Sequence, residues 1–296
     1  MYEAITANRR RTWVLLALVG SLVTALAYLF GLSQGLDWST SLIIGFSVAA
    51  IHGLISYQFG DKFALSSSGA VAIKKVDHPE VFRLVENLTL ANGQPLPKIY
   101  LINDPSPNAF ATGKSPETAS IAITTGLITL LTKTELEGVI AHELSHIKNY
   151  DIRVMTVVVV LVGAIAFFAD LIFRSQIFGH RGGGGEKNNS QVIWLVVGLV
   201  AAIIAPIIAK LIQLAISRQR EYLADASAAL LTRYPDGLAS ALEKISAINT
   251  PLARANHATA HLFISSPFGA SKFQNLFSTH PPAAQRIARL RALLTE

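Results

Sequence analysis

The sequence predicts a mainly α-helical membrane protein with a small β-sheet, an α+β fold with about four transmembrane helices. The chain has 296 residues, of which 51% are hydrophobic and only 15% are charged, whereas about 25% are charged in an ordinary soluble domain. Four apolar runs separate stretches of mixed composition, and about twenty apolar residues cross a hydrocarbon core as a helix.

The first two apolar runs, Trp13 to Leu32 and Leu42 to Tyr57, predict an N-terminal transmembrane hairpin within residues 1–60. Arg9 to Arg11 precede the first run, and the positive-inside rule therefore places the N-terminus in the cytoplasm. A signal peptide is the alternative, because Ala25 to Ala27 resembles a cleavage site. The apolar run continues past these residues, which favours an uncleaved anchor.

The third and fourth runs, Met155 to Phe173 and Val192 to Ile216, predict a second hairpin over residues 153–216. A hairpin returns the chain to the side from which it came. Residues 61–152 and 217–296 are therefore expected to form two parts of one cytoplasmic domain. Basic residues in the loop between the two runs leave open a hairpin that only dips into the membrane.

The first part of this domain shows short strands followed by a helix. Lys98 to Ile102, Ala109 to Ala111 and Ser120 to Thr124 alternate or run apolar, as short strands do. Thr132 and Glu135 fit a capping box, which predicts the start of a helix.

That helix carries the segment Ala141-His142-Glu143-Leu144-Ser145-His146. Positions i and i+4 share a helical face, so His142 and His146 can direct their imidazole nitrogens at one Zn²⁺. Glu143 then lies beside the open coordination position, where it could take a proton from a metal-bound water. The chain contains no cysteine, so any metal must be held by His, Asp or Glu side chains.

A catalytic zinc usually has a third protein ligand, and two carboxylates downstream are candidates. Glu221 and Asp225 are four residues apart, hence on one helical face. One of them could bind the metal while the other accepts the free N–H of a ligating histidine. Taken singly, each carboxylate could equally be an ordinary solvated side chain.

The order AHELSH, IKNYDIR, apolar hairpin and REYLADA resembles the HtpX family of membrane-bound zinc metalloproteases. The resemblance continues in Asn108 to Gly113 and in Ser278 to Pro282, and it covers nearly the whole chain. It implies a zincin-like, gluzincin-type peptidase domain with one Zn²⁺ per chain. The implied metal ligands are His142, His146 and Glu221, and the implied catalytic base is Glu143.

The resemblance also implies a place and a role in the cell. We expect a multi-pass protein of the bacterial plasma (inner) membrane with its active site on the cytoplasmic side, acting in stress response and quality control. The expected partners are the lipid bilayer and the substrates, which are misfolded membrane proteins and unfolded polypeptides. Nucleic acid is not expected, because the basic residues are scattered and often flank apolar runs, where anionic lipid headgroups explain them.

Two other functions remain open from the sequence. A prenyl-protein-processing membrane zinc peptidase needs a larger helical chamber, and four apolar runs argue against one. A non-catalytic metal-binding adaptor has no need of the base Glu143. The roles of Asp225, His280 and Arg286 are also open between orienting a ligand, stabilising the oxyanion and a structural role, and Asn108 to Gly113 is either a substrate-binding edge or a plain strand.

Overall fold

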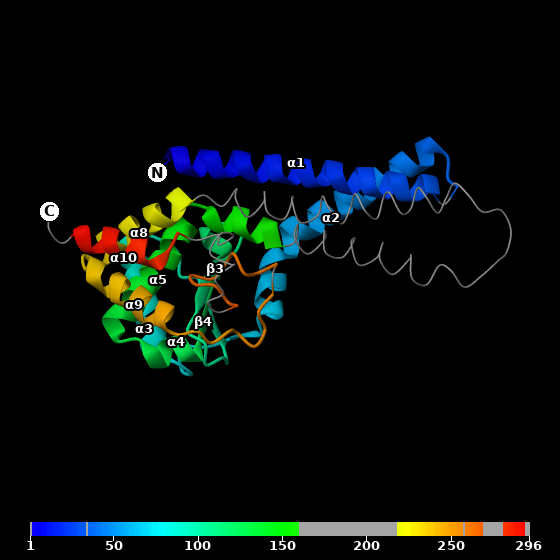
Figure 1. Ribbon diagram of the computed structural model, residues 1–296. Helices are drawn as coiled ribbons and strands as arrows, with labels where there is room; N and C mark the ends of the chain where they lie inside the picture. The colour runs from blue at the N-terminus through cyan, green and yellow to red at the C-terminus, as the bar shows by residue number, and fades with distance from the viewer. Residues whose placement is uncertain (1, 34, 160–217, 257, 269–280, 294–296) are drawn as a thin grey trace.

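The structure is a computed structural model that describes residues 2–33, 35–159, 218–256, 258–268 and 281–293. These residues form a mostly helical chain with one small mixed sheet (Figure 1). Of the third apolar run only Met155 to Val159 is described, as part of a helix. The rest of the predicted second hairpin and His280 lie outside the described residues.

The first two helices form a long hairpin that projects away from the globular part (Figure 1). Helix α1 spans Tyr2–Ser33 and α2 spans Trp38–Ser67, and Asp37 caps α2 by accepting hydrogen bonds from Ser39 N and Thr40 N at 3.0 Å. The helices pack closely at Gly45, where an added Cβ would lie 2.7 Å from the carbonyl oxygen of Thr24.

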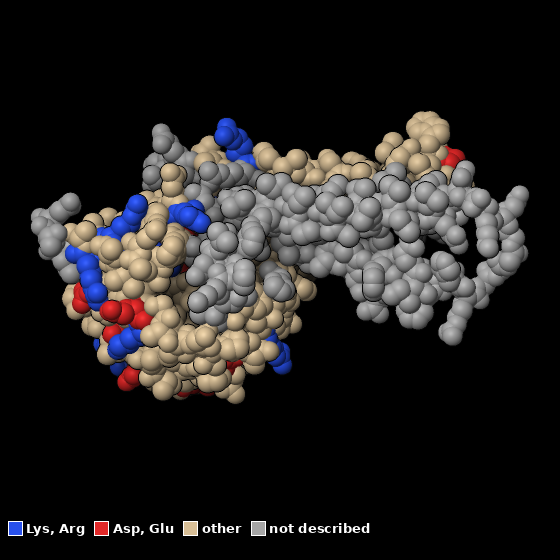
Figure 2. All heavy atoms as spheres, in the orientation of Figure 1, with Lys and Arg blue, Asp and Glu red and all other residues tan. Residues whose placement is uncertain are grey.

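On the face that Figure 2 shows, the visible side of α1 is largely uncharged between its two ends. Within the described ranges, α2 alone is long and apolar enough to cross a membrane. A transmembrane role for α2 fits the predicted N-terminal hairpin. The predicted number of four transmembrane helices stays a prediction.

The sheet has four strands in the order β1-β2-β4-β3. The strands span Ala70–Ala72, Lys98–Ile102, Ala109–Thr112 and Ser120–Thr124 for β1 to β4. Strands β2 and β4 are parallel, and the other two pairs are antiparallel. The three predicted strands are confirmed, whereas β1 was missed because its three residues are too short and too exposed to show a pattern.

Helix α5, Lys133–Lys148, lies at the centre of the globular part, in contact with α3, α8, α9 and β3. The predicted capping box at its start is confirmed, because Glu135 Oε2 accepts from Thr132 N at 2.8 Å and Thr132 Oγ1 accepts from Glu135 N at 3.4 Å. Gly138 lets α9 approach, since an added Cβ would lie 2.7 Å from the main-chain nitrogen of Leu238.

The remaining helices surround α5. They are α3 (Pro79–Asn92), the short α4 (Thr125–Leu130), α8 (Arg218–Thr232), α9 (Pro235–Ala247) and α10 (Ala283–Ala292). A 3₁₀ turn, Pro116–Thr118, precedes β4. Helix α10 begins directly after Pro282, which takes the N-cap position. Because α8 packs against both α5 and α10, residues from both halves of the chain meet at one buried place.

Candidate metal centre

Three of the predicted site residues meet between α5 and α8. His142 and His146 lie one turn apart on α5, and Glu221 lies in the first turn of α8. Their candidate ligand atoms all lie within 4.8 Å of one another, and all three residues are buried. The structure therefore brings together the His, His and Glu side chains that the sequence placed 75 residues apart.

The spacing of these atoms fits a zinc ion. Two atoms bound at about 2.05 Å to a tetrahedral zinc lie about 3.3 Å apart. The Nε2 atoms of His142 and His146 are 3.1 Å apart, and the Glu221 oxygens lie 3.7 Å and 3.5 Å from these two nitrogens. Two imidazoles and one carboxylate also form the donor set of catalytic zinc sites that keep a fourth position open.

Asp225 contacts the ring nitrogen of His142 that is not directed at the metal position. Its Oδ1 lies 3.0 Å from His142 Nδ1, so the other ring nitrogen, Nε2, is directed at the metal position. The same carboxylate binds the buried guanidinium of Arg286, with Nη2 at 2.6 Å from Oδ1 and Nε at 2.9 Å from Oδ2. The structure thus shows Arg286 as an ion-pair partner of Asp225.

Asp151 holds the second histidine in the same way. Its Oδ2 lies 3.0 Å from His146 Nδ1. The chain turns back immediately after α5 because Tyr150 adopts φ 60°, a left-handed conformation that costs energy for a non-glycine residue. Sequence reasoning missed Asp151, since a spacing of five residues places a side chain away from His146 on a continuous helix.

These contacts shift the pKa values of the two histidines in opposite directions. Burial, helped by the charge of Arg286, lowers the pKa of His142 to about 4. Burial also lowers the pKa of His146, but the hydrogen bond to Asp151 and the charge of Glu221 outweigh it and raise the pKa to about 9. The negative charge that holds a proton on His146 is equally suited to hold a divalent cation.

Glu143 is buried next to this cluster. Burial, and to a smaller degree the charge of Glu221, raises its pKa to about 7, although a hydrogen bond from the main chain of Ala111 opposes the shift. A carboxyl group with a pKa near neutrality can both accept and return a proton at physiological pH. The direction of this shift agrees with the predicted role of Glu143 as a base, which stays a prediction.

The contact with Ala111 places the edge strand β3 beside the site. Strand β3 pairs with β4 on one side only, and its other edge is met by the segment that follows α9. There Ile264 N donates to the carbonyl oxygen of Ala109 at 3.0 Å, and Asn108 Nδ2 donates to the carbonyl oxygen of Ser265 at 3.0 Å. The rings of Phe110 and Phe263 also meet edge to face at 4.9 Å.

Two further arginines lie in the first turn of α8. Arg218 is exposed. Arg220 is buried, and its Nη1 lies 3.6 Å from Asp151 Oδ1, so it belongs to the surroundings of His146.

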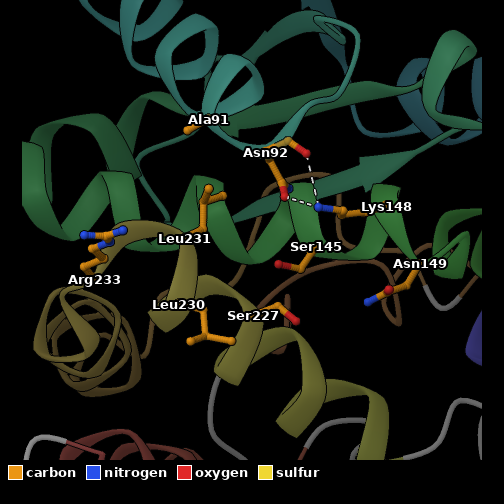
Figure 3. A pocket seen from close by; sticks show the side chains of 9 residues that line it. All are labelled: Ala91, Asn92, Ser145, Lys148, Asn149, Ser227, Leu230, Leu231 and Arg233. Atoms are coloured by element: carbon orange, nitrogen blue, oxygen red, sulfur yellow. Dashed lines mark hydrogen bonds between the residues drawn. The ribbon is translucent and has the colours of Figure 1, made fainter.

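A separate polar pocket of about 420 Å³ lies between α3, α5 and α8 (Figure 3). Lys148 and Asn92 lie at its wall, where Lys148 Nζ donates to Asn92 Oδ1 at 2.5 Å and to its carbonyl oxygen at 3.1 Å. None of the three candidate metal ligands lines this pocket. This pocket is therefore distinct from the place where the three candidate ligands meet.

The model of peptidase family M48 matches residues 76–294 of this chain, which include the whole metal cluster. The chain belongs to peptidase family M48. As a member of this family it is a zinc metalloprotease, in agreement with the donor set that the structure assembles. The roles of the individual site residues stay predictions.

Individual relatives agree with this family. A "Protease HtpX homolog" of Dictyoglomus turgidum is 45% identical over 296 residues, which cover 99% of this chain and 94% of the relative. One of Pyrococcus abyssi is 46% identical over 288 residues, covering 97% and 96%. The predicted HtpX resemblance is confirmed. The crystal structure of S. mikatae Ste24p shares the fold, with a TM-score of 0.50 and 18% identity over 98% of this chain and 67% of that chain.

Proposed function

We propose that this protein is a membrane-integrated zinc endopeptidase of the bacterial plasma membrane whose active site faces the cytoplasm. Its substrates are misfolded membrane proteins and unfolded polypeptides, which it removes as part of quality control under stress. The observation that carries the proposal is the buried cluster of His142, His146 and Glu221 with Glu143 beside it. A closed structural metal site would need no such base.

In the proposed reaction each site residue has its own role. His142, His146 and Glu221 hold the zinc, which when bound polarises the scissile carbonyl and increases the acidity of water. Glu143 accepts the proton of the attacking water and then delivers it to the leaving amine. Asp225 and Asp151 keep the two imidazole rings in the orientation that directs Nε2 inward.

The outer edge of β3 is the proposed place for the substrate main chain. Its Ala111 contacts Glu143, so a peptide added to this edge passes the base. Main-chain pairing accepts many sequences, which suits a protease for damaged proteins. The hydrogen bond from Ile264 N to Ala109 O occupies part of the same edge. The segment Leu262 to Ser265 therefore has to move away before a substrate strand can pair there.

The membrane arrangement is proposed from the hairpin. Residues 1–60 form the N-terminal anchor, residues 153–216 a second hairpin, and residues 61–152 and 217–296 the peptidase domain. The apolar helix α2 and the basic residues Arg9 to Arg11 before the first apolar run support a cytoplasmic N-terminus and a cytoplasmic peptidase domain.

Cysteine labelling tests this orientation directly, because the chain has no cysteine of its own. Leu36→Cys places a thiol in the turn between α1 and α2, and Lys133→Cys places one on the exposed start of α5. A membrane-impermeant maleimide should label Leu36→Cys in intact cells and Lys133→Cys only after permeabilisation. The reverse pattern would overturn the orientation.

A prenyl-protein-processing activity is the second candidate. The likeness to the Ste24p structure, at 18% identity, concerns the fold alone and favours neither candidate. The two candidates differ in substrate. The detergent-solubilised protein should cleave unmodified casein and should gain nothing from a prenyl group on a test peptide.

Zinc content and casein cleavage test the proposed activity together. Wild-type protein should carry one zinc per chain and cleave casein. Glu143→Gln should keep the zinc and lose cleavage by several orders of magnitude, since proton transfer by a side chain is worth roughly 10²–10⁴-fold in rate. Full cleavage by Glu143→Gln would refute the assignment of the base.

A further inference from the structure

A buried asparagine near the start of α1 contacts the surroundings of the metal centre. Asn8 is 2% exposed, whereas apolar residues further along the same helix, such as Trp13 at 68% and Leu18 at 64%, are exposed. A buried amide is costly unless it is hydrogen-bonded. The partners of Asn8 therefore explain why this polar residue is buried at this point of the helix.

Asn8 has two hydrogen-bond partners, and one of them contacts a candidate zinc ligand. Asn8 Nδ2 donates to Asp151 Oδ1 at 2.7 Å and to the carbonyl oxygen of Asn149 at 3.0 Å. The opposite oxygen of the same carboxylate, Asp151 Oδ2, lies 3.0 Å from His146 Nδ1. One carboxylate thus connects an amide of the N-terminal helix to an imidazole more than 130 residues later in the chain.

We propose that Asn8 is a positioning residue of the metal centre, acting through Asp151 to orient His146, so that the N-terminal hairpin forms part of the active centre. This inference rests on the proposed zinc site. Asn8 fixes the plane of the Asp151 carboxylate by holding Oδ1, which leaves Oδ2 directed at the histidine. It also holds the carbonyl oxygen of Asn149, and with it the turn at Tyr150 that brings Asp151 back to His146.

The guanidinium of Arg220 is a second possible partner for the Asp151 carboxylate. Its Nη1 lies 3.6 Å from Asp151 Oδ1 and 3.5 Å from Asn8 Oδ1. If the amide is removed, the carboxylate is free to rotate toward this guanidinium and away from the imidazole. Outer partners of a metal ligand set its orientation and basicity, so zinc should bind less tightly.

The zinc dissociation constant of the detergent-solubilised, full-length protein tests this role. It is measured by competition with a chelator and does not depend on activity. Asn8→Ala should weaken zinc binding roughly tenfold, the effect of losing about one net hydrogen bond. Asn8→Asp has the same shape but sets a carboxylate against Asp151, and it should weaken binding at least as much.

Thr12→Ala is the matched control. Thr12 lies one turn further along α1, is equally buried, and its hydroxyl donates to the carbonyl oxygen of Asn8 at 2.9 Å, within its own helix. This variant should bind zinc as the wild type does. It thereby separates loosening of the helix from loss of the contact with Asp151.

The zinc-binding measurements have three possible outcomes that decide the role of Asn8. Weaker zinc binding in both Asn8 variants with normal binding in Thr12→Ala supports the role of Asn8. Binding by Asn8→Ala within twofold of the wild type, or equal weakening in Thr12→Ala, overturns it and leaves the proposed protease intact. A wild-type protein that binds no zinc would instead refute the proposed function, and this inference with it.

Discussion

Neutralising Asp225 tests how the centre is held together. Asp225→Asn keeps the shape of the side chain but removes the charge that Arg286 contacts at 2.6 Å and 2.9 Å. Removing one partner of a buried ion pair usually costs about 3–5 kcal/mol. Glu221 Oε2 remains 3.7 Å from Arg286 Nη1 as a second counter-charge, so we expect about 3 kcal/mol, at the lower end of that range.

The loss should be visible in two measurements. A destabilisation of that size lowers the melting temperature by roughly 6–12 °C in a protein of this size. Zinc affinity should fall roughly 10- to 100-fold, because Asp225 also accepts from His142 Nδ1. Asp236→Asn is the matched control, since Asp236 pairs with Arg291 on the surface at 3.2 Å, where ion pairs contribute at most about 1 kcal/mol. Equal effects of the two substitutions would refute the reasoning.

Three further substitutions test the fold and the substrate edge. Burial raises the pKa of Glu135, but Lys244, at 2.7 Å, and the hydrogen bonds of Thr132 together outweigh burial and lower the pKa below its ordinary 4.5. This carboxylate therefore stabilises the fold above pH 4.5, and its contribution is lost as the pH falls through the lowered value; in pH-dependent unfolding, the difference in stability between the wild type and Glu135→Gln should disappear in acid. Gly126→Ala should lower the unfolding free energy by about 1–3 kcal/mol, because its Cβ would lie 2.0 Å from Pro105 O; an unchanged denaturation midpoint would contradict this. Ile264→Pro should cleave casein faster than its control Ile264→Ala. Both variants lose the isoleucine side chain, but only proline also lacks the main-chain N–H that occupies the edge of β3. Equal or slower cleavage by Ile264→Pro would contradict the idea that this N–H blocks the substrate edge.

Local sequence patterns predicted much of the fold around the site. The capping box from Thr132 to Glu135 correctly predicted the start of α5. The spacing of four residues between His142 and His146 correctly predicted that they share one helical face. Both features depend only on the geometry of one helix. The expectation that one of Glu221 and Asp225 would accept from a histidine also depends on one helical face, and Asp225 does so.

Contacts that depend on turns or on distant segments could not be predicted in this way. Asp151 reaches His146 only because Tyr150 adopts a positive φ, which no pattern of polar and apolar residues encodes. In the sequence, Asn8 is one polar residue shortly before the first apolar run, and its partner Asp151 lies 143 positions away. The position of Ile264 on the edge of β3 likewise results from tertiary packing of an irregular segment.

Zinc content after removal of the third ligand tests the proposed site most directly. Purified Glu221→Ala should hold well below one zinc per chain, because two imidazoles alone bind the ion weakly. Glu86→Ala, which loses a surface ion pair with Lys75, should hold one zinc, as should the wild type. Full retention of zinc by Glu221→Ala would contradict the assignment of His142, His146 and Glu221 as the metal ligands.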